Sequence, residues 1–183
     1  MYSNNPYTDY KMSDQVLNMG ATETLRNDHK HIKRLDKIIA KCSSDIYAGK
    51  AIPFSDLDKI TFLTSEFLDS IHYSREEDAY FPCVASYDHL KKEIRALLIE
   101  HEFSRRIATK IAYHVKCWKN NENSGEPVAR FLRTYSIYLN DHLSKEEEQD
   151  MFEQFQSVIA VSEKMESILK EINYLENQPW FKY

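Results

Sequence analysis

Apolar residues recur through most of the chain at the three- and four-residue spacing of an amphipathic α-helix. The first such stretch runs from about Thr22 to Tyr47, and Gly49 and Pro53 end it and open a loop. Its apolar stripe consists of Leu25, Ile32, Leu35, Ile38 and Ile39. The pattern therefore predicts a long first helix with one face turned toward a core.

A second amphipathic stretch follows this loop. Ser55 followed by Asp58 resembles a helix cap, and Phe81-Pro82 ends the stretch. Its predicted inner face consists of Ile60, Leu63, Phe67, Leu68 and Ile71. The spacing predicts a second helix about as long as the first.

The third and fourth helices are predicted on the same grounds. The third starts at Ser86 or Asp88 and ends at about Trp118, with Leu97, Leu98, Ile107 and Ile111 on its inner face. A loop rich in Asn and Gly follows, and Pro127 suits the first position of the fourth helix. The fourth helix is expected to reach about Phe155, with an apolar face that includes Phe131, Leu132, Tyr135, Tyr138, Leu139 and Leu143.

Four amphipathic helices with short connections predict an all-α fold, an antiparallel up-down four-helix bundle. A further helix from about Val158 to Leu175 would pack across it, before an aromatic C-terminal end. Residues 1 to about 12 are polar and rich in Tyr and Asn, which is typical of a loose arm. We therefore expect one domain over residues 1–183, with the bundle at about 22–156 and the additional helix at about 158–175.

Composition narrows the class of protein. The 183 residues include only 3 Gly and 5 Pro, which favours helices, and the net charge of −5 argues against a nucleic-acid partner. No apolar run approaches the roughly 20 residues of a membrane span, and the N-terminus lacks the order of a secretory signal. Three scattered cysteines suit a reducing compartment, so we expect a cytoplasmic protein without a membrane partner.

Two His/Glu pairs carry the candidate chemistry. His72 and Glu76 stand one helical turn apart in H-Y-S-R-E-E-D-A-Y-F-P, and His142 and Glu146 repeat this arrangement. Residues four apart share a helix face, so an imidazole and a carboxylate can approach one metal ion from the same side. The spacing alone is weak evidence, because a Glu-rich chain with 7 His supplies such pairs by chance.

The geometry of antiparallel helices provides a second test of whether these residues lie close together in the bundle. Residues at one level on two successive antiparallel helices lie equally far from the loop that joins them. The midpoint of positions 29 and 72 falls in the Gly49–Pro53 loop, that of 72 and 101 falls between the second and third helices, and that of 101 and 142 falls in the Asn/Gly loop. One level of the bundle is therefore predicted to contain His29, His72, His101 and His142.

Other histidines and acidic residues fit ordinary positions. His89 and Glu93 are also four apart, but at 100° per residue His89 points about 120° away from His101. His31 and His114 suit surface or hydrogen-bonded positions. A solvated charged face suits Glu77, Glu147 and Glu148.

Four inward histidines and two carboxylates predict a metal site, because burying Glu76 and Glu146 unpaired would be costly. Six nitrogen and oxygen ligands exceed the four of a structural zinc site and suit two first-row ions with shared carboxylates. Such ligands favour Fe or Mn, with Zn possible, and the remaining positive charge would attract a bridging oxo or hydroxo group. Open positions on redox metals would bind a small molecule such as O₂, peroxide or NO.

At these residues the chain resembles the hemerythrin-like family, the HHE cation-binding domain. The matching segments are D-H-K-H-I, H-Y-S-R-E-E-D-A-Y-F-P, E-H-E-F-S-R-R and H-L-S-K-E-E-E, within about Leu25 to Phe155. The resemblance implies a four-helix bundle around a non-haem di-iron centre, and His29 fits its first helix better than His31.

The chain departs from oxygen-carrying hemerythrins at two positions. Arg105 stands where those proteins usually have a second histidine of the third helix, and Glu146 lies four rather than five residues after the last histidine. The chain is therefore similar to the four-His, two-Glu subgroup, which includes iron-cluster repair proteins and iron or oxygen sensors. Repair proteins usually carry a Cys-bearing N-terminal segment, and here no Cys precedes Cys42.

Three neighbours of the predicted ligands complete the candidate site. Tyr138 and Tyr135 would line the pocket, the alternative being an aromatic stripe of the core. Arg105 would offset bridging negative charge or reach solvent.

The expected function is a di-iron protein that binds or senses O₂, NO, peroxide or iron, with no catalytic residue assigned. The alternatives are an oxidoreductase that consumes peroxide or NO, and a protein for iron-centre repair or iron handling. The expected partner is a small diatomic or peroxide ligand.

Overall fold

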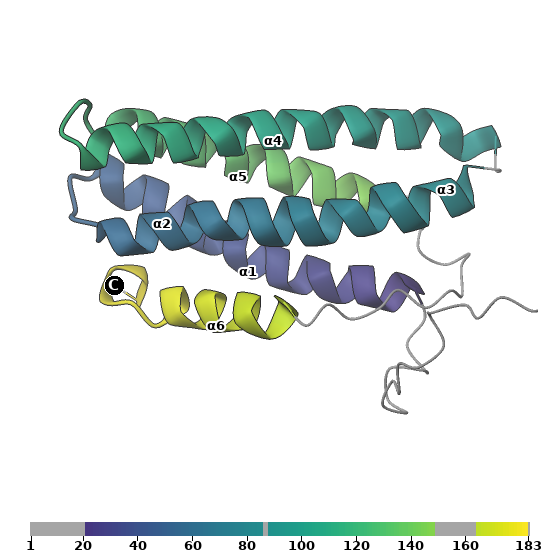
Figure 1. Cartoon of the computed structure of the whole chain (residues 1–183), viewed down its shortest axis with the longest axis horizontal. Helices are drawn as coiled ribbons and strands as arrows, with labels where there is room; N and C mark the ends of the chain where they lie inside the picture. The colour runs from purple at the N-terminus through teal and green to yellow at the C-terminus, as the bar shows by residue number, and fades with distance from the viewer. Residues whose placement is uncertain (1–20, 86–87, 149–163, 183) are drawn as a thin grey trace, which may run out of the picture.

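The computed structural model describes residues 21–85, 88–148 and 164–182, and this part of the chain folds into helices (Figure 1). Three of the long helices are α1 (Ala21–Tyr47), α4 (Lys91–Lys119) and α5 (Glu126–Glu148). The fourth long helical segment lies between α1 and α4 in the sequence and has several parts. The segments pack as α1 on α5, α5 on α4, and α4 on the fourth segment. The predicted all-α bundle is confirmed.

The fourth segment begins as α2 (Phe54–Leu63) and ends as α3 (Phe81–Val84). Between them the chain is mostly π-helical, in η1 (Thr64–Tyr73) and η2 (Glu76–Tyr80). π-Helical turns are rare and occur frequently at functional sites. The sequence spacing predicts an ordinary α-helix here. The π-helix, which is wider than an α-helix, is therefore a feature that only the structure shows.

The inner faces of the helices agree closely with the predicted apolar stripes. All five stripe residues of α1 are fully buried, as are Ile60, Leu63, Phe67 and Leu68 of the second segment. Leu132, Tyr135 and Leu139 of α5 are equally buried. The prediction for Leu98 is wrong: this side chain is 41% exposed, because its neighbour Leu97 faces the core and consecutive helical residues point about 100° apart.

The helix ends differ slightly from the prediction. Ser55 does not cap the second helix, because α2 already starts at Phe54, with Pro53 at the cap position. A short 3-10 turn, η3 (Asp88–Leu90), leads into α4. Gly49 has φ of +74°, a left-handed conformation that glycine adopts without strain, and it lets the chain reverse after α1.

The C-terminal part adds α6 (Lys164–Glu176) and α7 (Pro179–Lys182), which lie along the outside of the bundle against α1 (Figure 1). The inward face of α6 buries Met165, Ile168, Ile172 and Leu175. Polar contacts anchor both helices: Arg34 pairs with Glu176 of α6 at 2.7 Å, and the Trp180 indole of α7 donates to Asp56 at 2.8 Å.

The predicted stretches at 149–155 and 158–163 lie outside the described residues. None of the helices in the described ranges has the length and apolar character needed to cross a membrane.

Candidate metal centre

Four histidines from four helical segments meet inside the bundle, as the level argument predicts. His29 comes from α1, His72 from η1, His101 from α4 and His142 from α5. Each is at most 2% exposed, and Glu76 of η2 is fully buried beside them. Four side chains separated by up to 113 positions (142 − 29) in the sequence therefore share one small volume of the core.

The donor atoms form two groups that share Glu76. One group consists of His29, His72 and Glu76, and the other of Glu76, His101 and His142. Within each group, the candidate ligand atoms lie within 4.8 Å of one another. Both groups are fully buried, so any ion held there would be surrounded by protein.

The Glu76 carboxylate lies between the two groups. Its Oε1 is 3.6 Å from His72 Nε2, and its Oε2 is 3.2 Å from His101 Nε2. Each oxygen thus faces the imidazole of a different group. This is the arrangement that a bridging carboxylate requires.

Aromatic rings enclose the second group. Tyr73 stacks on His101 with the ring centroids 3.9 Å apart, and Phe81 stacks on His101 at 5.8 Å. Tyr73 also meets His142 edge-to-face at 5.8 Å. These rings pack against the two imidazoles and limit their rotation.

Three carboxylates approach the outward-facing ring nitrogens. Glu77 lies 2.7 Å from His101 Nδ1, and Glu100 lies 2.9 Å from His142 Nδ1. A carboxylate accepts a hydrogen bond, so each of these Nδ1 atoms carries the proton and the matching Nε2 lone pair faces the centre. This carboxylate–histidine arrangement is typical of metal-ligating imidazoles, since it fixes the tautomer and raises basicity.

The third carboxylate belongs to Asp28, whose Oδ2 is 3.7 Å from His72 Nδ1 and bonds the Arg75 guanidinium. Burial by itself raises the pKa of Asp28. Hydrogen bonding and charge attraction with His72 and Arg75 outweigh that effect and hold the pKa below its ordinary value. Asp28 is therefore ionised at neutral pH although it is buried.

The other two carboxylates have cationic partners as well. Arg105 donates to Glu77 at 2.8 Å and to Asp69 at 2.7 Å, and Lys145 donates to Glu100 at 2.6 Å. Burial raises the pKa of Glu100, but hydrogen bonding and charge attraction with His142 and Lys145 together outweigh burial and hold the pKa below its ordinary value. Each supporting carboxylate thus lies between an imidazole and a cationic side chain.

The sequence interpretation missed these supporting carboxylates. It assigned Glu77 to a solvated face, whereas the structure places it against His101. Asp28 and Glu100 directly precede predicted ligands, yet they approach the histidine of the next helical segment rather than their own neighbour. The acidic residues directly before His29 and His101 were a visible signal, but Glu102, directly after His101, is 53% exposed, so adjacency alone would not have separated them.

The remaining predicted residues lie in different surroundings. The backbone of α5 places position 146 one turn after His142, but the Glu146 side chain lies outside the described residues. Tyr138 is half-buried, and its ring stacks at 6.2 Å on His142. Arg105 acts on Glu77 rather than at the centre. Tyr135 accepts a hydrogen bond from Ser104 in a layer beyond Tyr73.

The other histidines also have ordinary partners. His31 lies 3.3 Å from an Arg34 nitrogen on the half-buried surface of α1. His114 stacks on Phe131 at 5.2 Å, near the far end of α4. The His89 side chain lies outside the described residues.

The donor set fits two first-row transition metals. Each group supplies two imidazoles and one carboxylate, the combination found at non-haem iron sites with open positions. A closed structural zinc site would need four protein donors for each ion. The bundle core is also where helical proteins build carboxylate-bridged metal pairs. Fold and donor set together define a metal-binding helical bundle.

The comparison with protein families agrees with this class. The model of the hemerythrin HHE cation-binding domain matches residues 20–175. The chain belongs to the hemerythrin HHE cation-binding family. No curated protein sequence and no solved structure matches it.

Proposed function

We propose that this chain is a non-haem di-iron protein whose centre binds a small molecule such as O₂, NO or peroxide. The observation that carries the proposal is the pair of buried His₂ groups that share the Glu76 carboxylate. Two imidazoles and a shared carboxylate leave each ion with fewer than six protein ligands, so a small molecule has room to bind. Mn and Zn remain the competing metals.

Each of the candidate ligands has a proposed role at the centre. His29 and His72 would hold one ion, His101 and His142 would hold the other, and both groups would share Glu76. Glu146 is proposed as a further ligand on the basis of its spacing from His142. Bound iron would supply redox chemistry and open coordination positions.

The surrounding residues position these ligands. Glu77 and Glu100 hold protons at the Nδ1 atoms of His101 and His142, which directs both Nε2 lone pairs inward. Tyr73 and Phe81 stack on His101 and hold its ring in place. The chain thereby provides a preformed, buried site for two cations.

Metal analysis of the purified protein tests the proposal. Two iron ions per chain are expected, with an absorption spectrum that changes when the reduced protein meets air. His72→Ala and His142→Ala should each lower the iron content, because each removes a donor from one group. His31→Ala is the matched control, since His31 lies on the surface of α1 and its loss should leave loading unchanged.

Two results would refute the proposal: protein without a transition metal, or unchanged iron loading in both His72→Ala and His142→Ala. Steady-state consumption of H₂O₂ or NO by the iron-loaded protein would favour the oxidoreductase alternative. A stoichiometric reaction without turnover would favour binding or sensing.

A further inference from the structure

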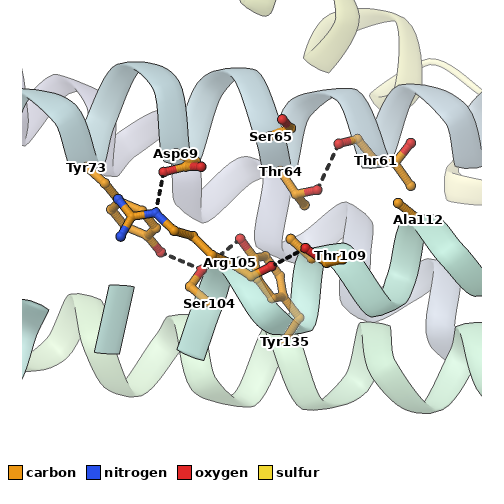
Figure 2. Close-up of a pocket in the computed structure, with 11 residues that line it drawn as sticks. Thr61, Thr64, Ser65, Asp69, Tyr73, Ser104, Arg105, Thr109, Ala112 and Tyr135 are labelled. Atoms are coloured by element: carbon orange, nitrogen blue, oxygen red, sulfur yellow. Dashed lines mark hydrogen bonds and ion pairs between the residues drawn. The ribbon is translucent and has the colours of Figure 1, made fainter. Parts of the chain in front are cut away.

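A groove with several hydroxyl groups in its lining runs along the bundle between the α2–η1 segment and α4 (Figure 2). Its volume is about 260 Å³, and small side chains on α4, Ala108 and Ala112, leave the space open. Tyr73 lines the groove, and the ring of Tyr73 stacks on His101. The groove therefore ends one aromatic ring away from the candidate metal centre.

The hydroxyl groups in this groove are mostly oriented as acceptors. Thr61, Thr64 and Thr109 each donate their hydroxyl proton to a backbone carbonyl of their own helical segment, at 2.8 to 2.9 Å. Their oxygen lone pairs remain available to a molecule in the groove. A solute that carries O–H donors can satisfy them, whereas O₂ and NO cannot.

The charges in the groove compensate each other. Asp69 and Arg105 both line it and form an ion pair at 2.7 Å. Arg105 also pairs with Glu77 at 2.8 Å, so its guanidinium already has two carboxylate partners and an anion gains no free cationic partner. The lining thus favours a small, neutral hydrogen-bond donor.

Beneath the groove, three hydroxyl groups form a chain. Tyr73 donates to Ser104 at 2.8 Å, and Ser104 donates to Tyr135 at 3.0 Å (Figure 2). Tyr73 is 1% exposed, and its ring contacts both His101 and His142. A molecule that passes Tyr73 would consequently arrive at the His101/His142 side of the centre first.

We propose that this groove is the entry route for hydrogen peroxide, or a similarly small neutral O–H donor, to the His101/His142 side of the centre. The inference rests on the proposed function and names the ligand class that this face of the protein admits. Apolar gases need no hydrogen-bonding route, since they dissolve readily in an apolar protein interior. The groove should therefore affect how fast hydrogen peroxide reaches the centre but not how fast O₂ or NO reaches it.

Filling the groove tests the route. Ala108→Leu and Ala112→Leu add bulk at positions away from every candidate ligand. Ala40→Leu is the matched control, because Ala40 lines a different surface hollow, between α1 and α5. The reduced, iron-loaded proteins are mixed with H₂O₂ or O₂, and the absorbance change gives a second-order rate constant for each.

We expect Ala108→Leu to lower the rate constant for H₂O₂ about tenfold and to leave that for O₂ within about twofold. Ala112 lies at the more exposed end of the groove, so Ala112→Leu should also slow the reaction with H₂O₂ more than that with O₂, but by a smaller factor. A second readout needs no reactivity: iron release to acetohydroxamic acid, a small neutral O–H donor, should slow in the same order. Melting temperature and iron content establish that each variant is folded and loaded.

Unchanged H₂O₂ rates in both groove variants would overturn the route, as would equal slowing of H₂O₂ and O₂. The failure of the proposed function looks different. Protein that binds no iron refutes that function and this route together, whereas iron-loaded protein with unchanged H₂O₂ rates in both groove variants refutes the route alone.

Discussion

Replacement of Glu77 by Gln would remove one negative charge beside His101 and preserve the side-chain shape. The Gln amide oxygen can still accept a hydrogen bond from His101 Nδ1, the atom that Glu77 approaches at 2.7 Å. It cannot stabilise positive charge on the imidazole as a carboxylate does. The substitution therefore isolates the electrostatic support of one predicted ligand.

The expected cost falls on metal affinity rather than on folding. Loss of an outer partner of a ligand histidine typically weakens metal binding about 10- to 100-fold, which corresponds to about 1.4–2.8 kcal/mol. The ion pair with Arg105 adds little to stability, because both side chains are partly exposed, at 25% and 30%, and such pairs contribute about 0–1 kcal/mol. Arg105 also keeps its second partner, Asp69.

Competition with a chromophoric chelator measures the affinity of the wild-type chain, Glu77→Gln and a control. Glu102→Gln is the matched control, since Glu102 directly follows His101 but is exposed and pairs with Arg106. We expect Glu102→Gln to bind metal as the wild type does. Thermal unfolding of the metal-free proteins should give similar melting temperatures for all three.

If Glu77→Gln and Glu102→Gln held metal equally tightly, the carboxylate beside His101 would have no part in metal binding. A large drop in the melting temperature of metal-free Glu77→Gln would likewise contradict the reasoning. In that case Glu77 would serve the fold instead.

Two further predictions concern stability. Leu132 is fully buried, so Leu132→Ala should lower the free energy of unfolding by about 2–5 kcal/mol in urea denaturation, whereas exposed Arg133→Ala should change it little. A hydrogen bond from Arg34 lowers the pKa of Glu176 below its ordinary value of 4.5. That stabilisation is complete above the ordinary pKa and is lost as pH falls below it, so Arg34→Ala should reduce the acid sensitivity of the melting temperature. An acid dependence identical in Arg34→Ala and the wild type would show that another group is responsible.

The helices and their inner faces could be predicted because helical periodicity is a local property. Leu25, Ile32 and Leu35 repeat at the spacing of one helix face, and the structure buries all three. The positions of the loops were enough to predict that the four histidines lie at the same height in the bundle. Two residues equally far from the loop that joins two antiparallel helices lie side by side, because both helices rise by the same distance per residue.

The π-helical widening around His72 and Glu76 was not predictable from spacing. A π-turn accommodates one more residue per hydrogen-bonded ring than an α-turn, and its placement depends on packing against neighbouring helices. In this π-helical segment two consecutive carboxylates contact His101: Glu76 lies 3.2 Å from Nε2, on the side of the centre, and Glu77 lies 2.7 Å from the outward-facing Nδ1.

The sequence by itself determined which residues face inward, where the chain reverses and which six side chains are candidate ligands, because each depends on local periodicity and loop position. Only the tertiary structure decided which carboxylate supports which imidazole. Asp28, Glu77 and Glu100 each approach the histidine of another helical segment, and such pairings depend on how far each helix is rotated about its axis. That rotation is set by the packing of the whole core, to which residues distant in the sequence contribute together.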